Sequence, residues 1–127
     1  MSGRTEPPAE LTEFLQRTVD SVAELEALLL AHGNPDTDWD APSLAARLYV
    51  PERAAAEVLA ALHRRGLLHQ AEDRFTYRPA SDALRQSVDQ LAVWYPRALV
   101  AITRLIHSKP GAAVRGFADA FRLREDK

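Results

Sequence analysis

The chain of 127 residues contains no cysteine, which excludes a disulfide framework, a thiol nucleophile and a cysteine zinc site. Its five glycines are scattered singly, so no glycine-rich loop is present to hold a phosphate group. The longest apolar runs, such as residues 28–31 and 98–102, are far too short to span a bilayer. The N-terminus is acidic and contains proline, unlike a signal peptide. These absences predict a cytoplasmic protein without a membrane partner.

Patterns for catalysis and metal binding are also missing. Asp36, Asp38 and Asp40 alternate like part of a calcium loop, but the glycine and the glutamate of that loop are absent. The four histidines lack the spacing that would place two metal ligands on one helix face: His32, His63, His69 and His107. We therefore expect no metal, no cofactor and no enzymatic activity, and we expect the function to be recognition.

Residues 40–78 carry the most organised pattern in the chain. Residues 43–48 and 52–65 each place apolar side chains on one helix face, and a tight turn at residues 49–51 separates them. Gly66 is a good left-handed stop for the second helix. The residues that follow alternate like two short strands joined by a polar turn. The predicted order is helix, turn, helix and two-stranded ribbon.

The run SLAARLYVPERAAAEVLAALHRRGLL and this ribbon resemble the winged-helix domain of bacterial transcription regulators, including the multiple-antibiotic-resistance-regulator type. The resemblance implies a mainly α fold with a small β-wing, a winged helix-turn-helix with long N- and C-terminal helices. It also implies that the chain binds double-stranded DNA. Residues 10–80 would form the winged-helix domain, after a disordered lead-in at residues 1–9.

Segments before the motif are expected to complete this domain. Residues 11–19 and 22–33 have helical spacing, as one bent helix or two short ones, and Ser21 begins a capping-box sequence. Asp40 is expected to cap the first motif helix. Trp39 is expected to take the short strand that often precedes that helix in winged folds.

Eight residues are expected to contact DNA. The outer face of the second motif helix carries Arg53 and Arg64, which suit guanine edges or phosphates, and Glu57, which can neutralise Arg53. Five others are expected to anchor phosphates: Ser43, Arg47, Arg65, Arg74 and Arg78. The alternative is that these arginines are ordinary solvated residues paired with nearby acids.

The distribution of charge and of polar side chains favours a partner other than DNA. The net charge is −2, and the excess of basic residues lies in residues 83–127, outside the motif. The second motif helix is rich in alanine, and Glu72 and Asp73 make the tip of the ribbon acidic. A winged-helix module that binds a protein is therefore a second interpretation. It would use the alanine-rich helix or the C-terminal stripe that contains Phe117 and Phe121.

Residues 81–108 form the longest helical pattern, and their apolar positions have the spacing of a coiled-coil seam. The seam consists of Leu84, Val88, Leu91, Tyr95, Ala98, Ile102 and Leu105. Residues 81–127, a long helix plus a C-terminal amphipathic helix, are therefore expected to form a homodimer. The alternative is that the long helix folds back on the N-terminal helix. Pro96 should kink or split it near Trp94, and an effector pocket lined by Trp94 and Tyr95 is a further possibility.

Overall fold

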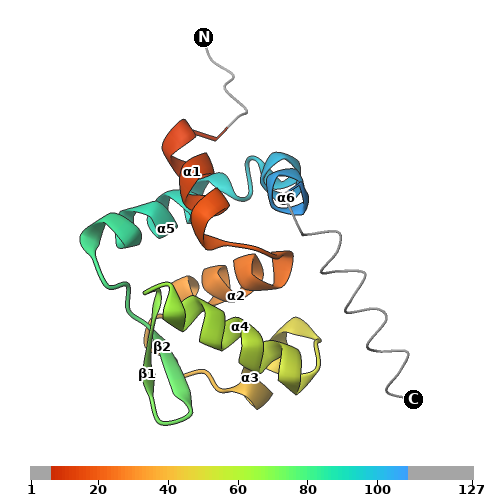
Figure 1. Ribbon diagram of the computed structural model, residues 1–127, viewed down its shortest axis with the longest axis vertical. Coiled ribbons are helices and arrows are strands. Elements are labelled where there is room, and N and C mark those ends of the chain that lie inside the picture. Colours follow the sequence, from red (N-terminus) through yellow and green to blue (C-terminus); the bar gives the residue numbers. More distant parts are fainter. Residues whose placement is uncertain (1–6, 109–127) are drawn as a thin grey trace.

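The computed structural model describes residues 7–108, and in this part the chain is mainly helical with one small antiparallel sheet (Figure 1). In chain order the elements are α1 Ala9–Thr18, α2 Val22–Gly33, α3 Ala41–Leu48, α4 Glu52–Arg64, β1 Leu68–Ala71, β2 Arg74–Tyr77, α5 Asp82–Trp94 and α6 Leu99–His107. The predicted C-terminal amphipathic segment with Phe117 and Phe121 lies outside the described residues. So does most of the predicted lead-in.

Local capping signals set the ends of the helices. Ser21 accepts a hydrogen bond from the backbone N–H of Glu24, so α2 begins at its predicted cap. Ser81 accepts one from the backbone N–H of Leu84 and caps α5 in the same way. At α3, Asp40 accepts from the N–H of Ser43 at 2.9 Å while Ser43 Oγ accepts from the N–H of Asp40 at 3.0 Å. The hydrogen bonds from the Ser43 backbone and then from its side chain hold the pKa of Asp40 below its ordinary value.

Two left-handed residues shape the turns around α4. Tyr49 ends α3 at φ 59°, and Gly66 follows α4 at φ 80°, as predicted for a helix stop. A Cβ atom at Gly66 would meet Ala80 Cβ at 3.4 Å, so the backbone conformation rather than space selects glycine there.

The small sheet is the predicted ribbon. β1 and β2 pair from Leu68 with Tyr77 to Ala71 with Arg74, and Glu72 adopts φ 60° in the turn between them. Trp39 adds a bridge to Phe75, with both N–H···O distances at 2.7 Å. The prediction of a short extended segment at Trp39 is confirmed.

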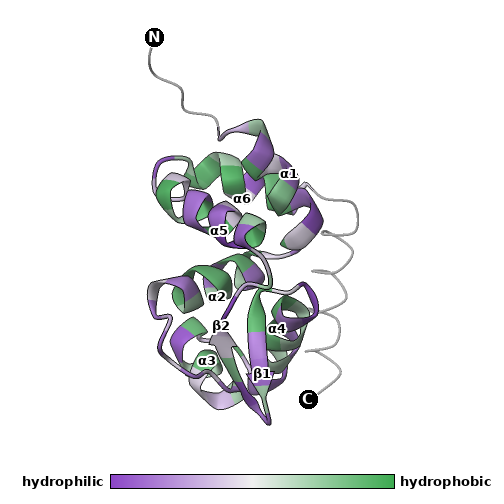
Figure 2. Ribbon diagram, turned by 90° about the vertical axis from the view of Figure 1, so that its left-hand side faces the viewer, coloured by the Kyte–Doolittle hydropathy of each residue, from purple (hydrophilic) through white to green (hydrophobic). Residues whose placement is uncertain are grey.

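A continuous core joins two groups of helices. Figure 2 shows α1, α5 and α6 at one end of the molecule, and α2, α3, α4 and the hairpin at the other. α2 packs against α3, α4, α5, α6 and β2, so it links the two groups. α1, which was expected to belong to the winged-helix domain of residues 10–80, packs on α5 and α6.

The predicted long helix over residues 81–108 is two helices, as Pro96 indicated. α5 ends at Trp94 and α6 begins at Leu99, so the seam does not run along one straight axis. Val88, Leu91 and Ile102 have no exposed surface within the single chain, where α5 and α6 pack on α1 and α2. Leu84, Tyr95 and Leu105 are partly buried against the same core. In the structure these apolar positions pack within one chain, which is the fold-back arrangement given above as the alternative to a dimer seam.

A cluster of three side chains joins the hairpin to α2 and α5. His32 Nε2 lies 2.9 Å from Asp89 Oδ1, and the rings of His32 and Tyr77 meet edge to face with their centroids 5.5 Å apart. Tyr77 Oη is buried and has no hydrogen-bond partner among the described residues. Burial, followed by the negative charge of Asp89, raises the pKa of Tyr77 to about 12.

Tyr77→Phe is expected to make the fold more resistant to alkali. The folded chain keeps the phenolic proton at pH values where the unfolded chain loses it, so stability falls as pH rises from about 10 to about 12. Urea midpoints at about pH 9 and about pH 11.5 should therefore differ less in the variant than in the native chain. At neutral pH the change should be nearly neutral, because it removes a hydroxyl without a partner. An equal alkaline loss in both proteins would contradict this assignment.

Candidate nucleic-acid interface

The outer face of α4 is the candidate surface for contact with a nucleic acid. Ala55, Val58, Leu59 and Leu62 are buried against the core. Arg53, Glu57 and Arg64 are exposed on the opposite face, as predicted, with the methyl group of Ala60 half-buried between them. The helical period of the sequence thus divides α4 into a packed face and a solvent face.

Further exposed arginines belong to the elements beside α4. Arg47 lies on α3, Arg74 on β2, and Arg78 just after β2. α3 packs on α4, and β1 packs on both α4 and β2, so these residues belong to the same end of the molecule (Figure 2). The guanidinium of Arg47 lies 5.7 Å from the centre of the Trp39 ring. The hydrogen bonds from Ser43 are the main cause of the lowered pKa of Asp40, and the charge of Arg74 lowers it further.

Arg65 has a different place from the one predicted. Its guanidinium donates to Glu24 Oε1 at 2.6 Å and to Asp20 Oδ2 at 2.8 Å, and its side chain is 24% exposed. These two ion pairs join the end of α4 to Asp20 and to the first turn of α2. The guanidinium of Arg65 is therefore engaged within the fold rather than directed outward to a phosphate. Its two partners lie more than 40 residues away in sequence, so local spacing gave no signal of them.

Ser43 is exposed, but its hydroxyl is engaged in the α3 cap. Oγ accepts from the Asp40 N–H at 3.0 Å and donates to the Asp40 carbonyl at 3.1 Å. The main role of Ser43 in this structure is therefore to begin α3.

Acidic side chains lie among these arginines. Glu57 is exposed on α4 between Arg53 and Arg64, and Glu72 and Asp73 form the exposed tip of the hairpin. An approaching phosphate would be repelled at the tip and by Glu57, and attracted by Arg53 and Arg64.

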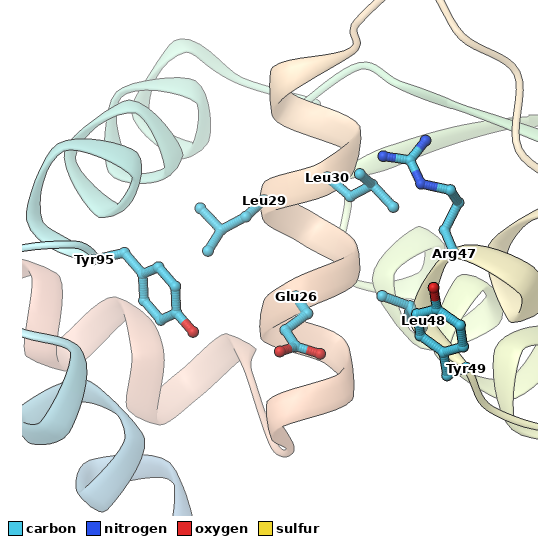
Figure 3. Close-up of a pocket in the computed structure, with 7 residues that line it drawn as sticks. All are labelled: Glu26, Leu29, Leu30, Arg47, Leu48, Tyr49 and Tyr95. Carbon is cyan, nitrogen blue, oxygen red and sulfur yellow. The ribbon is translucent and has the colours of Figure 1, made fainter.

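The structure also has a groove, and Tyr95 is the one lining residue that was expected to lie in a pocket. The groove crosses α2 beside the end of α3, has a volume of about 570 Å³, and is lined by Glu26, Leu29, Leu30, Arg47, Leu48, Tyr49 and Tyr95 (Figure 3). Tyr95 was expected to line a pocket together with Trp94. In this groove it lies beside residues of α2, and Trp94 is not among the lining residues. The remaining lining residues come from distant parts of the chain, so periodicity alone did not bring them together.

Tyr49→Gly is expected to stabilise the fold. A non-glycine residue in the left-handed region costs about 1 kcal/mol, and the Tyr49 side chain is 93% exposed, so its removal costs little packing. Chemical denaturation should show a gain of roughly 0.5 kcal/mol over Tyr49→Ala, which also lacks the ring but keeps the Cβ atom. A glycine variant less stable than the alanine variant would contradict the strain at this turn.

Among residues 7–108, no three side chains of histidine, aspartate or glutamate gather in a group that would hold a metal ion. None of the described helices has both the length and the apolar character needed to cross a bilayer. No protein-family model, curated protein or solved structure matches the chain.

Proposed function

We propose that the chain is a winged-helix protein that binds duplex DNA and regulates transcription. In this proposal α4 enters the major groove, and the β1–β2 hairpin is the wing. The order α3, turn, α4 and hairpin supports it, as does the bridge of Trp39 to Phe75, which stands where winged folds often have a third short strand.

The observation that carries the proposal is the set of exposed arginines at the α4 end of the molecule. Arg53 and Arg64 lie on the solvent face of α4, while Arg47 and Arg74 extend from the elements beside it. Arginine is the side chain that most often contacts phosphates and guanine edges in protein–DNA complexes. The exposed face of α4, with arginines on the helix and beside it, suits the DNA major groove, which is bordered by two phosphate backbones.

Arg53 and Arg64 have separate roles in this proposal. Eleven residues of helix separate them by about 16 Å, or roughly five base-pair steps. The N-terminal residues of a recognition helix are the ones that contact base edges. Arg53 therefore contacts a base, and Arg64, near the other end of α4, contacts a phosphate together with Arg47, Arg74 and Arg78.

A homodimer would place two α4 helices on a two-fold operator. Because the predicted seam is buried within one chain, we place the dimer contact at the turn between α5 and α6. Val93, Leu99 and Val100 there are 55%, 47% and 64% exposed. Light scattering tests this arrangement: the mass of two chains supports it, and the mass of one chain contradicts it.

A protein partner is the second candidate, and the acidic residues favour it. Glu57 on α4 and the Glu72–Asp73 tip oppose phosphate, whereas a protein surface with basic side chains would accept them. The exposed methyl group of Ala56 and the half-buried methyl groups of Ala54 and Ala60 would then supply apolar contact.

Salt dependence separates the two candidates. Fluorescence anisotropy of a labelled random-sequence duplex should show binding that weakens roughly a hundredfold between about 50 mM and about 200 mM salt, because four arginines displace counterions. Absence of binding even at low salt would leave the protein partner as the better proposal.

A further inference from the structure

The groove beside α2 has an uncommon set of lining groups. Figure 3 shows Glu26 on α2 between Tyr95 on one side and Leu48 and Tyr49 on the other. Leu29 points toward Tyr95, so apolar surface lies next to the carboxylate. The groove therefore combines the Glu26 carboxylate, the Arg47 guanidinium, two phenol rings and a leucine floor.

Glu26 is the acidic group of this groove. Its side chain is exposed, and no salt bridge joins it to a basic side chain among the described residues. Arg47 also lines the groove, but its guanidinium is held over Trp39 and points away from Glu26 (Figure 3). Burial and then the charge of Glu26 raise the pKa of Tyr95, which places the phenol within the field of the carboxylate.

Tyr49 lines the side of the groove opposite Tyr95, and its backbone conformation is energetically unfavourable. Its backbone lies in the left-handed region, and its ring is almost wholly exposed, so the ring contributes little to the packed core. Residues held in such costly backbone conformations are found often at ligand-binding sites.

We propose that this groove binds a lipophilic organic cation, an ion whose positive centre carries aromatic or alkyl groups. The Glu26 carboxylate pairs with the positive centre, and the rings of Tyr49 and Tyr95 attract it through their π faces. Leu29, Leu30 and Leu48 cover the apolar substituents. A volume of about 570 Å³ lies within the usual range for small-molecule sites. This site does not depend on whether α4 binds DNA.

Two ions of the same shape and opposite charge test the proposal. Isothermal titration calorimetry of the full chain should show binding of tetraphenylphosphonium and at least tenfold weaker binding of tetraphenylborate. Equal affinities would show that apolar contact alone drives binding. That result, or the absence of phosphonium binding, would overturn the proposal.

Matched variants locate the site. Glu26→Gln should weaken phosphonium binding about tenfold, and Tyr95→Leu, which keeps an apolar side chain, should weaken it about threefold. Asp36→Asn removes the same charge from an exposed loop outside the groove, and it should leave the affinity within about twofold. Because Glu26 and Asp36 are both exposed, neither replacement is expected to unfold the chain. Unchanged affinity in Glu26→Gln would overturn the proposal.

Discussion

The double variant Arg53→Ala/Arg64→Ala is expected to lower the affinity for duplex DNA roughly a hundredfold. Each arginine contact with a base or a phosphate contributes about 1–3 kcal/mol, and the two residues lie far enough apart along α4 for their effects to add. Fluorescence anisotropy at constant salt measures the change. Both side chains are exposed, so circular dichroism should show the same helix content as in the native chain.

Arg17→Ala/Arg104→Ala is the matched control for this variant. It removes the same total charge from α1 and α6, which lie at the other end of the molecule, and both residues are exposed (Figure 2). At physiological salt such distant charges are screened, and the affinity should change by less than about threefold. Glu57→Gln should act in the opposite direction and strengthen binding, because it removes a negative charge from the face of α4. Equal losses in the two double variants would mean that only net charge matters.

Replacement of Arg65 by methionine is expected to destabilise the fold by about 2–3 kcal/mol. The change leaves Asp20 and Glu24 without their common partner at a junction where the Glu24 side chain is 12% exposed. Urea denaturation measures the loss through a lower midpoint at an unchanged slope. The folded variant should bind DNA as the native chain does, because the guanidinium of Arg65 faces α1 and α2 rather than solvent.

Arg64→Met gives the control at the neighbouring position. Arg64 is exposed, so its replacement should change stability by less than about 0.5 kcal/mol while it weakens DNA binding. Neutralising both acids in the Arg65→Met background, by Asp20→Asn and Glu24→Gln, should restore about 1 kcal/mol, since the two carboxylate charges that Arg65 balanced are then removed. A stability loss in Arg65→Met no larger than that in Arg64→Met would contradict the role of this ion pair.

Features set by local residues were predictable from the sequence. The caps at Ser21, Asp40 and Ser81 depend on hydrogen bonds to residues three positions away, and the hairpin turn depends on its own neighbours. The break at Pro96 follows from a missing N–H group and a steric clash within one turn. The two faces of α4 follow from helical period alone.

Features that depend on residues far apart in the chain were not predictable from the sequence. The spacing of Val88, Leu91 and Ile102 indicates an apolar helix face, but it does not indicate whether the same chain or a second chain covers that face. Arg65 was expected to anchor a phosphate, whereas its partners in the structure are Asp20 and Glu24, more than 40 residues away in sequence. The groove residues on α2, on α3 and at Tyr95 meet only when the two helix groups pack together.

The most direct test of the DNA-binding account is a titration of isotope-labelled chain with a short duplex, followed by NMR of its backbone amides. The account predicts that the largest shifts fall on α4 and on the β1–β2 hairpin, with little change on α1, α5 and α6. Shifts confined to those three helices, or no shifts at low salt, would contradict it.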